Sequence, residues 1–394
     1  MAAVLEGIRV LDFTRVMAGP FATALLADVG AEVIKVEPPD GDDYRHIGPF
    51  KAGESGLFIQ MNRGKRSITA NLKSPEGLEA VKRLIAVSDV VIENFRPGVA
   101  DRLGIGYEAV RAVNPRAVYV SISGFGQDGP LSGRPAYDLI AQAMAGMMSM
   151  TGERDGSPMR VGDALGDLAS GLYGAWAIMV ALHNRAQTGA GQRIDLAMFD
   201  AIFSLMPTPM SLLFYAGQIP TRNGNQHPIS TPFGSFRASD GDVIIAVANN
   251  ALFAALLKAI GRDDLTGDRR FADDASRTAN EPALRTIIED WSGTRTVVEV
   301  VAALDAGGIP ASPIATFAEA ANSAHARHRA LIAEVVQPDA GRVPVIEQPV
   351  HFSGVERGHL RPAPRLGEHT DEVLASLAGY SAEDIARLRD SGAI

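Results

Sequence analysis

One carboxylate of this chain, Asp167, stands where its type and position could support covalent chemistry, because it directly precedes the most apolar stretch, residues 168–182. A carboxylate at a helix start more often caps the helix by accepting backbone N–H groups. The same N–H groups and the helix dipole would also keep a partly buried carboxylate ionised, so that it can act as a nucleophile. Asp163 is an alternative nucleophile. The neighbours of Asp167 are small and leave room for a ligand: Gly166, Ala169, Ser170 and Gly171.

Two short basic loops could bind phosphate groups. The first covers residues 62–67 (NRGKRS), with Lys73 nearby, and the second covers residues 94–98 (NFRPG), with Arg102 a few positions beyond. The second loop follows an apolar run, at the carboxyl end of a predicted parallel strand, where open α/β folds bind their ligands. Clustered cations suit a phosphate-bearing ligand. A solvated basic surface is the other interpretation and, from charge alone, the commoner one.

Several familiar motifs are missing or incomplete. Residues 124–129 (GFGQDG) fit the glycine pattern of dinucleotide-binding proteins, but Pro130, Gly133 and Pro135 disrupt the helix that must begin there. Nicotinamide and flavin are therefore not expected. The eight histidines show no spacing typical of a metal site, and no metal is expected.

The composition excludes further classes. With 394 residues and no cysteine, the chain has no thiolate nucleophile and no disulfide. The 37 basic and 46 acidic residues give a net charge of −9, which argues against a general nucleic-acid surface. The apolar run at 168–182 is shorter than the roughly 20 residues of a membrane span, and the first residues lack a signal-peptide pattern. A cytoplasmic protein without a membrane partner is expected.

The elements that would position these residues alternate between strand and helix. Strands are predicted at 8–13, 32–37, 67–72, 89–93 and 117–123, with helices at 20–29, 74–88, 137–150, 168–185 and 195–214, the last one broken at Pro207 and Pro209. Such alternation predicts an α/β fold with a largely parallel sheet.

The character of the sequence changes after residue 215. A hairpin is predicted at 235–247 with Asp240-Gly241 at its turn, followed by two or three helices, a loop and strand at 307–315, a proline-rich stretch, and a helical segment at 370–389. We therefore predict three parts: a large α/β domain at 1–215, a small α+β domain at 222–320, and a linker with a C-terminal segment at 336–394.

Several motifs, in one order along essentially the whole chain, resemble class III CoA-transferases. These include formyl-CoA and carnitine CoA-transferases, and the α-methylacyl-CoA racemases are related to them. The matching segments are residues 5–13 (LEGIRVLDF), 18–20 (AGP), 30–37 (GAEVIKVE), 65–67 (KRS), 93–98 (ENFRPG) and 366–370 (LGEHT).

This resemblance implies a Rossmann-like large domain, a smaller domain, a C-terminus that returns to the large domain, and an interlocked homodimer. It implies that Asp167 is the nucleophile and forms an aspartyl-CoA intermediate. The substrates are then an acyl-CoA donor and a carboxylic acid acceptor, with no tightly bound cofactor. By the same matching, CoA-binding positions are Val16, Met17, Ala18, Ala70, Asn71, Leu72, Lys73, Asn94, Phe95, Arg96, Arg102 and Tyr137.

Two positions favour a transferase over a racemase. The similar racemases use a histidine where this chain has Tyr137, and a glutamate where it has Arg237. Neither replacement suits proton transfer near neutral pH. A racemase and a non-catalytic acyl-CoA-binding protein remain as alternatives.

Other departures bear on the substrate. The stretch at 224–228 is shorter than the glycine-rich flap of oxalate-using formyl-CoA transferases, Met17 replaces a glutamine, and Pro38 replaces an arginine at a CoA contact. Oxalate is therefore less expected than a small dicarboxylate such as succinate or a methyl-branched relative. The candidate partners for its carboxylates are Arg15, Arg45 and Arg237.

Overall fold

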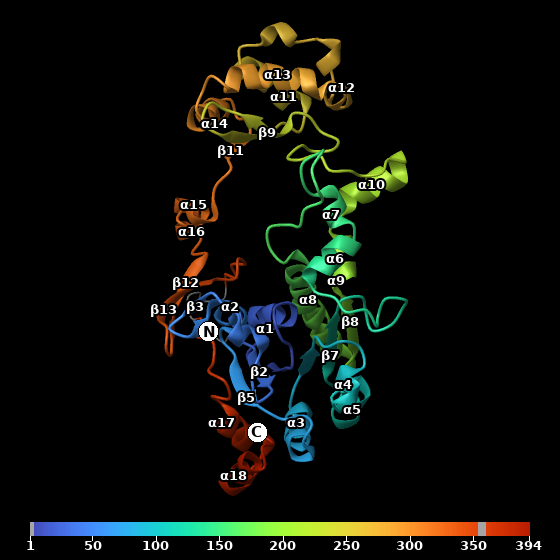
Figure 1. Ribbon diagram of the computed structural model, residues 1–394, viewed down its shortest axis with the longest axis vertical. Helices are drawn as coiled ribbons and strands as arrows, with labels where there is room; N and C mark the ends of the chain where they lie inside the picture. Colours follow the sequence, from blue (N-terminus) through green and yellow to red (C-terminus); the bar gives the residue numbers. More distant parts are fainter. Residues whose placement is uncertain (1–3, 354–359) are drawn as a thin grey trace. The chain divides into compact units, whose positions relative to one another are not determined.

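A computed structural model describes residues 4–353 and 360–394 of the chain (Figure 1). The chain divides into two compact units. The first unit contains Met1–Met148, Arg160–Ile219 and Ala324–Ile394, and the second contains Ser149–Met159 and Pro220–Ser323. The predicted boundary between 215 and 222 lies beside the change of unit at Ile219. Residues 149–159, expected in the large domain, group instead with the second unit.

A six-stranded parallel sheet forms the centre of the first unit. The strands are β1 (Arg9–Asp12), β2 (Glu32–Glu37), β5 (Arg66–Thr69), β6 (Val90–Glu93), β7 (Val118–Ser123) and β8 (Arg193–Ala197). Their order is β5-β2-β1-β6-β7-β8, and every neighbouring pair is parallel. The predicted α/β class with a parallel sheet is confirmed. Chain order reverses between β1 and β6, and open α/β sheets bind ligands at such a reversal.

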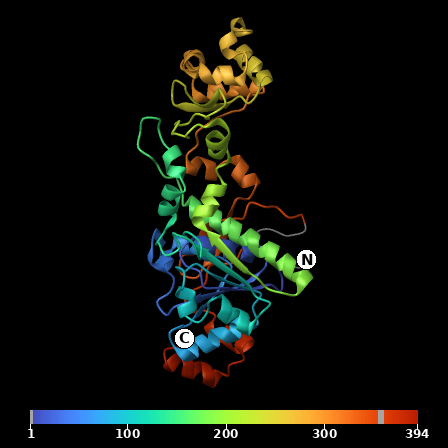
Figure 2. The ribbon, with the colours of Figure 1, turned by 90° about the vertical axis from the view of Figure 1, so that its right-hand side faces the viewer.

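Helices cover both faces of this sheet, because side chains along a strand point alternately to opposite faces. On one face Val10 packs in a cluster with α1 (Ala18–Asp28) and α8 (Leu165–Thr188), the long helix seen in Figure 2. On the other face Leu11 packs with α3 (Pro75–Ala86), α5 (Tyr107–Val113), α17 (Thr370–Ala378) and α18 (Ala382–Asp390). The C-terminal helices thus complete the core of the first unit.

The remaining elements of the chain outside the second unit's core are short. They are η1 (Asp43–His46), β3 (Phe50–Lys51), β4 (Glu54–Ser55), α2 (Gly56–Asn62), α4 (Val99–Arg102), α6 (Asp138–Met144), α7 (Met147–Met150), α9 (Met198–Ser204), α10 (Pro207–Ala216), α15 (Phe317–Ala321), α16 (Ala324–His328), β12 (Ile332–Gln337) and β13 (Gly341–Ile346).

An antiparallel sheet with helices forms the second unit. Its strand order is β11 (Ala311–Pro313), β10 (Asp242–Ala246) and β9 (Phe233–Arg237), so the hairpin around Asp240-Gly241 is confirmed. The helices are α11 (Asn250–Ala259), α12 (Asp274–Ala279), α13 (Glu281–Ser292) and α14 (Val297–Ala306), with 3-10 turns at Asp263–Leu265 and Arg269–Phe271. A core of its own includes Phe236, Val243, Leu256, Leu284 and Val300.

Four local predictions are wrong. The helix expected from residue 195 begins instead as strand β8. This strand is at the edge of the sheet, and its pairing with β7 prevails over the helical preference of the apolar sequence. The helix expected at 137–150 is divided at Gly146, and the one at 370–389 at Gly379, where both glycines have positive φ. The proline-rich C-terminal stretch begins with the β12–β13 hairpin, which packs on α2 through Val335 and Phe58.

The helix α8 is longer than the predicted apolar run. It has 24 residues, and by length and composition alone it is the one helix in the described ranges that could cross a membrane. Within the fold it packs against α1, β7 and β8, and 44% of its apolar window is buried. A core helix of a globular domain passes the same test of length and composition.

Substitution of Leu84 tests the packing of α3 against α17. Leu84 is fully buried in the cluster that also holds Val373 and Leu374. Leu84→Ala should lower the free energy of unfolding by about 2–5 kcal/mol, because it removes methyl groups and leaves a cavity. Urea denaturation measures this change. Val87→Ala, at the exposed end of the same helix, should change it by less than about 0.5 kcal/mol; equal losses would contradict this packing.

Candidate active site

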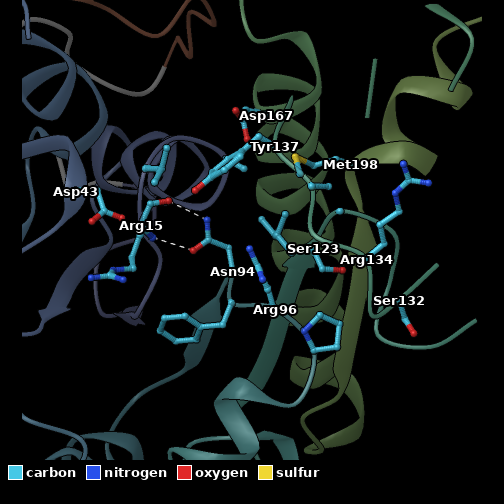
Figure 3. Close-up of a pocket in the computed structure, with 17 residues that line it drawn as sticks. Arg15, Asp43, Asn94, Arg96, Ser123, Ser132, Arg134, Tyr137, Asp167 and Met198 are labelled. Atoms are coloured by element: carbon cyan, nitrogen blue, oxygen red, sulfur yellow. Dashed lines mark hydrogen bonds between the residues drawn. The ribbon is translucent and has the colours of Figure 1, made fainter. Parts of the chain in front are cut away.

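A cavity of about 250 Å³ lies in the first unit at the carboxyl ends of β1, β6 and β7 (Figure 3). This is the point where the strand order reverses. Asp167 enters from α8, while Arg15 and Asn94 come from the loops after β1 and β6. The lining residues are Arg15, Val16, Ala18, Asp43, Asn94, Phe95, Arg96, Pro97, Ile122, Ser123, Gly124, Ser132, Arg134, Ala136, Tyr137, Asp167 and Met198.

Asp167 is the third residue of α8 and does not cap it. The N-cap position is Ala164, which forms no side-chain cap, and the N–H of Gly166 donates instead to Oδ1 of Asp138 at 2.6 Å. Within the described residues, the carboxyl of Asp167 accepts no hydrogen bond. The capping interpretation of Asp167 is therefore wrong, and the side chain is left available at the cavity wall.

The surroundings of Asp167 disfavour its charge. Burial raises its pKa to about 7, with the neighbouring carboxylates of Asp138 and Asp163 acting in the same direction. The expectation that the helix start keeps Asp167 ionised is wrong, because burial and the two acidic neighbours raise its pKa. With this pKa, the acid and carboxylate forms of Asp167 coexist near neutral pH. The carboxylate form is the one that can act as a nucleophile.

Asp138 contacts the start of α8, and the sequence motifs did not indicate it as a site residue. Its Oδ2 accepts a hydrogen bond from Nε2 of Gln142 at 2.7 Å, and Oε1 of Gln142 accepts from the N–H of Val161 at 3.0 Å. This chain of contacts joins α6 to the segment before α8 and so holds Asp167 in place. Its adjacency to Tyr137 was the only sequence signal.

The loop after β1 forms the opposite part of the wall. Oδ1 of Asn94 accepts the N–H of Arg15 at 2.8 Å, and Nδ2 of Asn94 donates to the carbonyl of Arg15 at 2.8 Å. These two bonds tie the loops after β1 and β6 across the reversal of strand order. The next residue, Val16, has a positive φ of 68°, and Gly19 allows the first turn of α1 to approach Thr14, which a Cβ would meet.

The structure brings part of the predicted site together. Residues 16 and 18, residues 94–96, Tyr137 and Asp167 line the cavity, with Met17 buried between two of them. The other predicted positions lie outside its lining: Ala70, Asn71, Leu72, Lys73 and Arg102. Ala70 is buried in the core, whereas the side chains of Lys73 and Arg102 are exposed.

Sequence reasoning missed the wall provided by β7 and the loop after it. Ser123 is the last residue of β7, and Gly124, Ser132 and Arg134 follow in the loop. Gly124 is the first residue of the glycine pattern at 124–129. Its position after a parallel strand was the usable signal.

The first basic loop is not a phosphate site. Arg63 forms a buried ion pair with Asp28, Lys65 forms one with Asp12 at 3.0 Å, and Arg66 pairs with Glu32. The interpretation of this loop as a solvated basic surface is also wrong, because the side chains of Arg63 and Lys65 are buried.

The cations that line the cavity are Arg15, Arg96 and Arg134. Arg45 is held by Glu37 through two hydrogen bonds, and Arg237 lies in the second unit beside Glu289. Of the three arginines named for the substrate carboxylates, only Arg15 therefore lines this cavity. In residues 4–353 and 360–394, no group of three or more His, Asp or Glu side chains could hold a metal ion.

The pH dependence of stability tests the environment of Asp167. Folding raises the pKa of Asp167 from 3.8 to about 7, so the unfolded chain releases this proton at lower pH than the folded chain does. Stability should therefore fall as pH rises from about 4 to about 7 and stay level above that. Asp167→Asn should therefore increase the free energy of unfolding at pH 8 by about 1–3 kcal/mol, with a smaller gain toward pH 5. Urea denaturation at both pH values measures it. Asp155→Asn, at an exposed position that does not influence the pKa of Asp167, serves as the control; a loss of stability in Asp167→Asn at pH 8 would contradict the assignment.

Comparisons with known proteins extend over nearly the whole chain. Residues 5–370 match the family described as CoA-transferase family III. The chain is 38% identical to succinyl-CoA:glutarate CoA-transferase of Mus musculus, over 99% of this chain and 90% of that protein. It is 41% identical to acetyl-CoA:oxalate CoA-transferase of Acetobacter aceti, over 96% and 97%. A solved CaiB/BaiF family protein from Brucella suis superposes with a TM-score of 0.84 at 38% identity, over 96% of this chain and 100% of that one.

Proposed function

Since this chain belongs to the class III CoA-transferase family, whose enzymes use an acyl-CoA donor and a carboxylate acceptor, we propose that Asp167 is its nucleophile and forms an aspartyl-CoA thioester. The match confirms the family that the motifs indicate. The observation that carries the proposal is the unpaired, desolvated carboxyl of Asp167 on the wall of the cavity.

The reaction proceeds by exchange of acyl bonds. A carboxylate oxygen of Asp167 attacks the donor carbonyl, the C–S bond breaks, and an anhydride and CoA thiolate form. The thiolate attacks the aspartyl carbonyl and releases the donor acid, which leaves aspartyl-CoA. The acceptor carboxylate attacks that thioester and forms a second anhydride. CoA thiolate then attacks the acceptor carbonyl and frees Asp167. No proton, metal or nucleotide is consumed.

Two features of the cavity support the charged transition states of this sequence. The first turn of α1 has no side-chain cap, and Ala18 from that turn lines the cavity, so backbone N–H groups can face a tetrahedral oxyanion. The raised pKa of Asp167 also makes its carboxylate more basic, hence more nucleophilic, than an exposed aspartate.

CoA binding is proposed over the predicted positions. The predicted residues on the cavity wall contact the thioester end; they are Val16, Ala18, Asn94, Phe95, Arg96 and Tyr137. Met17 lies buried between the first two. Residues 70–73 and Arg102 lie outside the cavity lining and bind the adenosine and phosphate end. The exposed ammonium of Lys73 and guanidinium of Arg102 suit phosphate oxygens.

The acceptor is proposed to be a small dicarboxylate. The relatives above are transferases of glutarate and of oxalate, and Arg15 and Arg134 line the cavity as cationic partners for a second carboxylate. The departures at Met17 and 224–228 make oxalate less expected as the acceptor. Because a relative named for oxalate is 41% identical, oxalate is still among the acids to be tested.

An interlocked homodimer in the cytoplasm remains part of the proposal. The dimer is supported by exposed apolar side chains on two helices of the first unit. They are Leu172, Trp176 and Val180 on α8, and Phe214 and Tyr215 on α10. Patches of this kind mark interaction surfaces.

Turnover by the purified chain tests the function. With succinyl-CoA as donor and a panel of glutarate, oxalate, mesaconate and methyl-branched acids, mass spectrometry should detect at least one new acyl-CoA. Asp167→Asn should lower kcat by about 10³-fold or more, because the covalent route is lost. Solvent-exposed Asp155→Asn is the control.

Two results would contradict this assignment. Exchange of the α-hydrogen in heavy water without any acceptor acid would indicate a racemase. Binding of CoA without turnover across the panel would indicate a non-catalytic acyl-CoA-binding protein.

The pH profile tests the role of the Asp167 carboxylate. Because the ionised form attacks, kcat/KM should rise with pH through a midpoint of about 7 and level off at higher pH. Asp138→Asn keeps a hydrogen-bond acceptor for Gly166 but removes one negative charge, so the midpoint should shift to lower pH. An unchanged midpoint in this variant would contradict the electrostatic assignment.

A further inference from the structure

The turn between β1 and α1 contains a strained residue. Val16 has φ of 68°, in the left-handed region that β-branched residues rarely adopt. Such strain persists only where surrounding contacts impose it, and it concentrates at functional sites. Both Val16 and its neighbour Ala18 line the cavity that holds Asp167.

Side chains from other elements hold the backbone polar groups of this turn. Nζ of Lys35, on β2, donates to the carbonyl of Thr14 at 2.8 Å. Oδ1 of Asp42 accepts the N–H of Val16 at 3.2 Å. The side-chain amide of Asn94 accepts a hydrogen bond from the N–H of Arg15 and donates one to its carbonyl.

Lys35 and Asp42 are also bound to each other. Their Nζ and Oδ2 atoms lie 2.7 Å apart, and both side chains are 1% exposed. Oδ1 of Asp42 accepts a second N–H, that of Tyr44, at 2.9 Å. The pair therefore contacts the turn on both sides of Arg15, at Thr14 and at Val16. Separating the two side chains would leave a buried charge without its partner, which is strongly destabilising.

We propose that the Lys35–Asp42 pair is a positioning device for acyl-CoA, which imposes the left-handed conformation of Val16 and thereby shapes the wall that receives the thioester. This role rests on the proposed function, because acyl-CoA is the ligand concerned. Neither side chain contacts the ligand; both act through the turn.

Paired substitutions at positions 42 and 16 test this role. Asp42→Ala should raise the KM for the acyl-CoA donor and the Kd for CoA by about tenfold or more, because Val16 can relax. The KM for the acceptor acid should change by less than about twofold.

Glycine adopts a positive φ without strain. In a Val16→Gly background, the effect of Asp42→Ala should therefore fall to about threefold or less. This rescue is a readout that a merely structural role of Asp42 would not produce.

Asp28→Ala is the matched control, because it breaks another buried ion pair of the first unit, that with Arg63. It should lower Tm but leave both KM values close to wild type. If Asp42→Ala does not fold, Asp42→Asn replaces it, since the amide keeps an acceptor for Val16 but loses the charge that faces Lys35.

Two outcomes would overturn the role. One is an equal penalty from Asp42→Ala in the wild-type chain and in the Val16→Gly background. The other is a folded Asp42→Ala variant, judged by circular dichroism, that binds CoA as wild type does. Failure of the proposed function is distinct: wild type would then bind CoA but transfer it to no acid, and the CoA affinities would still decide the role of the pair.

Discussion

The buried charges around Asp12, the last residue of β1, are the constraint on which the site depends. Burial alone would raise the pKa of Asp12, but the ammonium groups of Lys65 and Lys35 hold it at about 2. Burial lowers the pKa of Lys65 to about 8 even beside Asp12. Since an unpaired buried charge costs several kcal/mol, these groups have one workable arrangement. That arrangement fixes where the loop after β1 ends and where α1 begins, and so fixes one wall of the cavity.

Asp167 differs from these groups in one physical respect: it is desolvated, and no cation in the described part of the chain lowers its pKa. Its neighbours Asp138 and Asp163 are themselves acidic. The two kinds of buried carboxyl therefore serve different ends. Asp12 is ionised and unreactive because its charge is fully satisfied, whereas Asp167 holds a charge that a covalent bond to an acyl group would remove. The proposed chemistry follows from this contrast, and the first unit contains both environments.

The sequence predicted the parallel sheet because β-branched runs such as 32–37 and 117–123 alternate with helical stretches along the first 185 residues. It missed β8 because a strand at the sheet edge, with exposed Arg193 and Asp195, resembles the start of the apolar helix behind it. Asp167 was selected from its place before the apolar run at 168–182, but its environment was not predictable. Its pKa depends on Asp138, far earlier in the chain, and the pairing of Lys65 depends on Asp12. Contacts between positions so distant in the chain are set by tertiary packing and leave no local pattern.

Detection of a CoA adduct on Asp167 tests the central claim most directly. The chain is incubated with succinyl-CoA in the absence of an acceptor, quenched in acid and analysed by intact and peptide mass spectrometry. The account predicts an added mass of one CoA less one water, located on Asp167, which disappears when an acceptor acid is supplied before the quench. Turnover without any adduct at Asp167, or an adduct on Asp163 in its place, would contradict it.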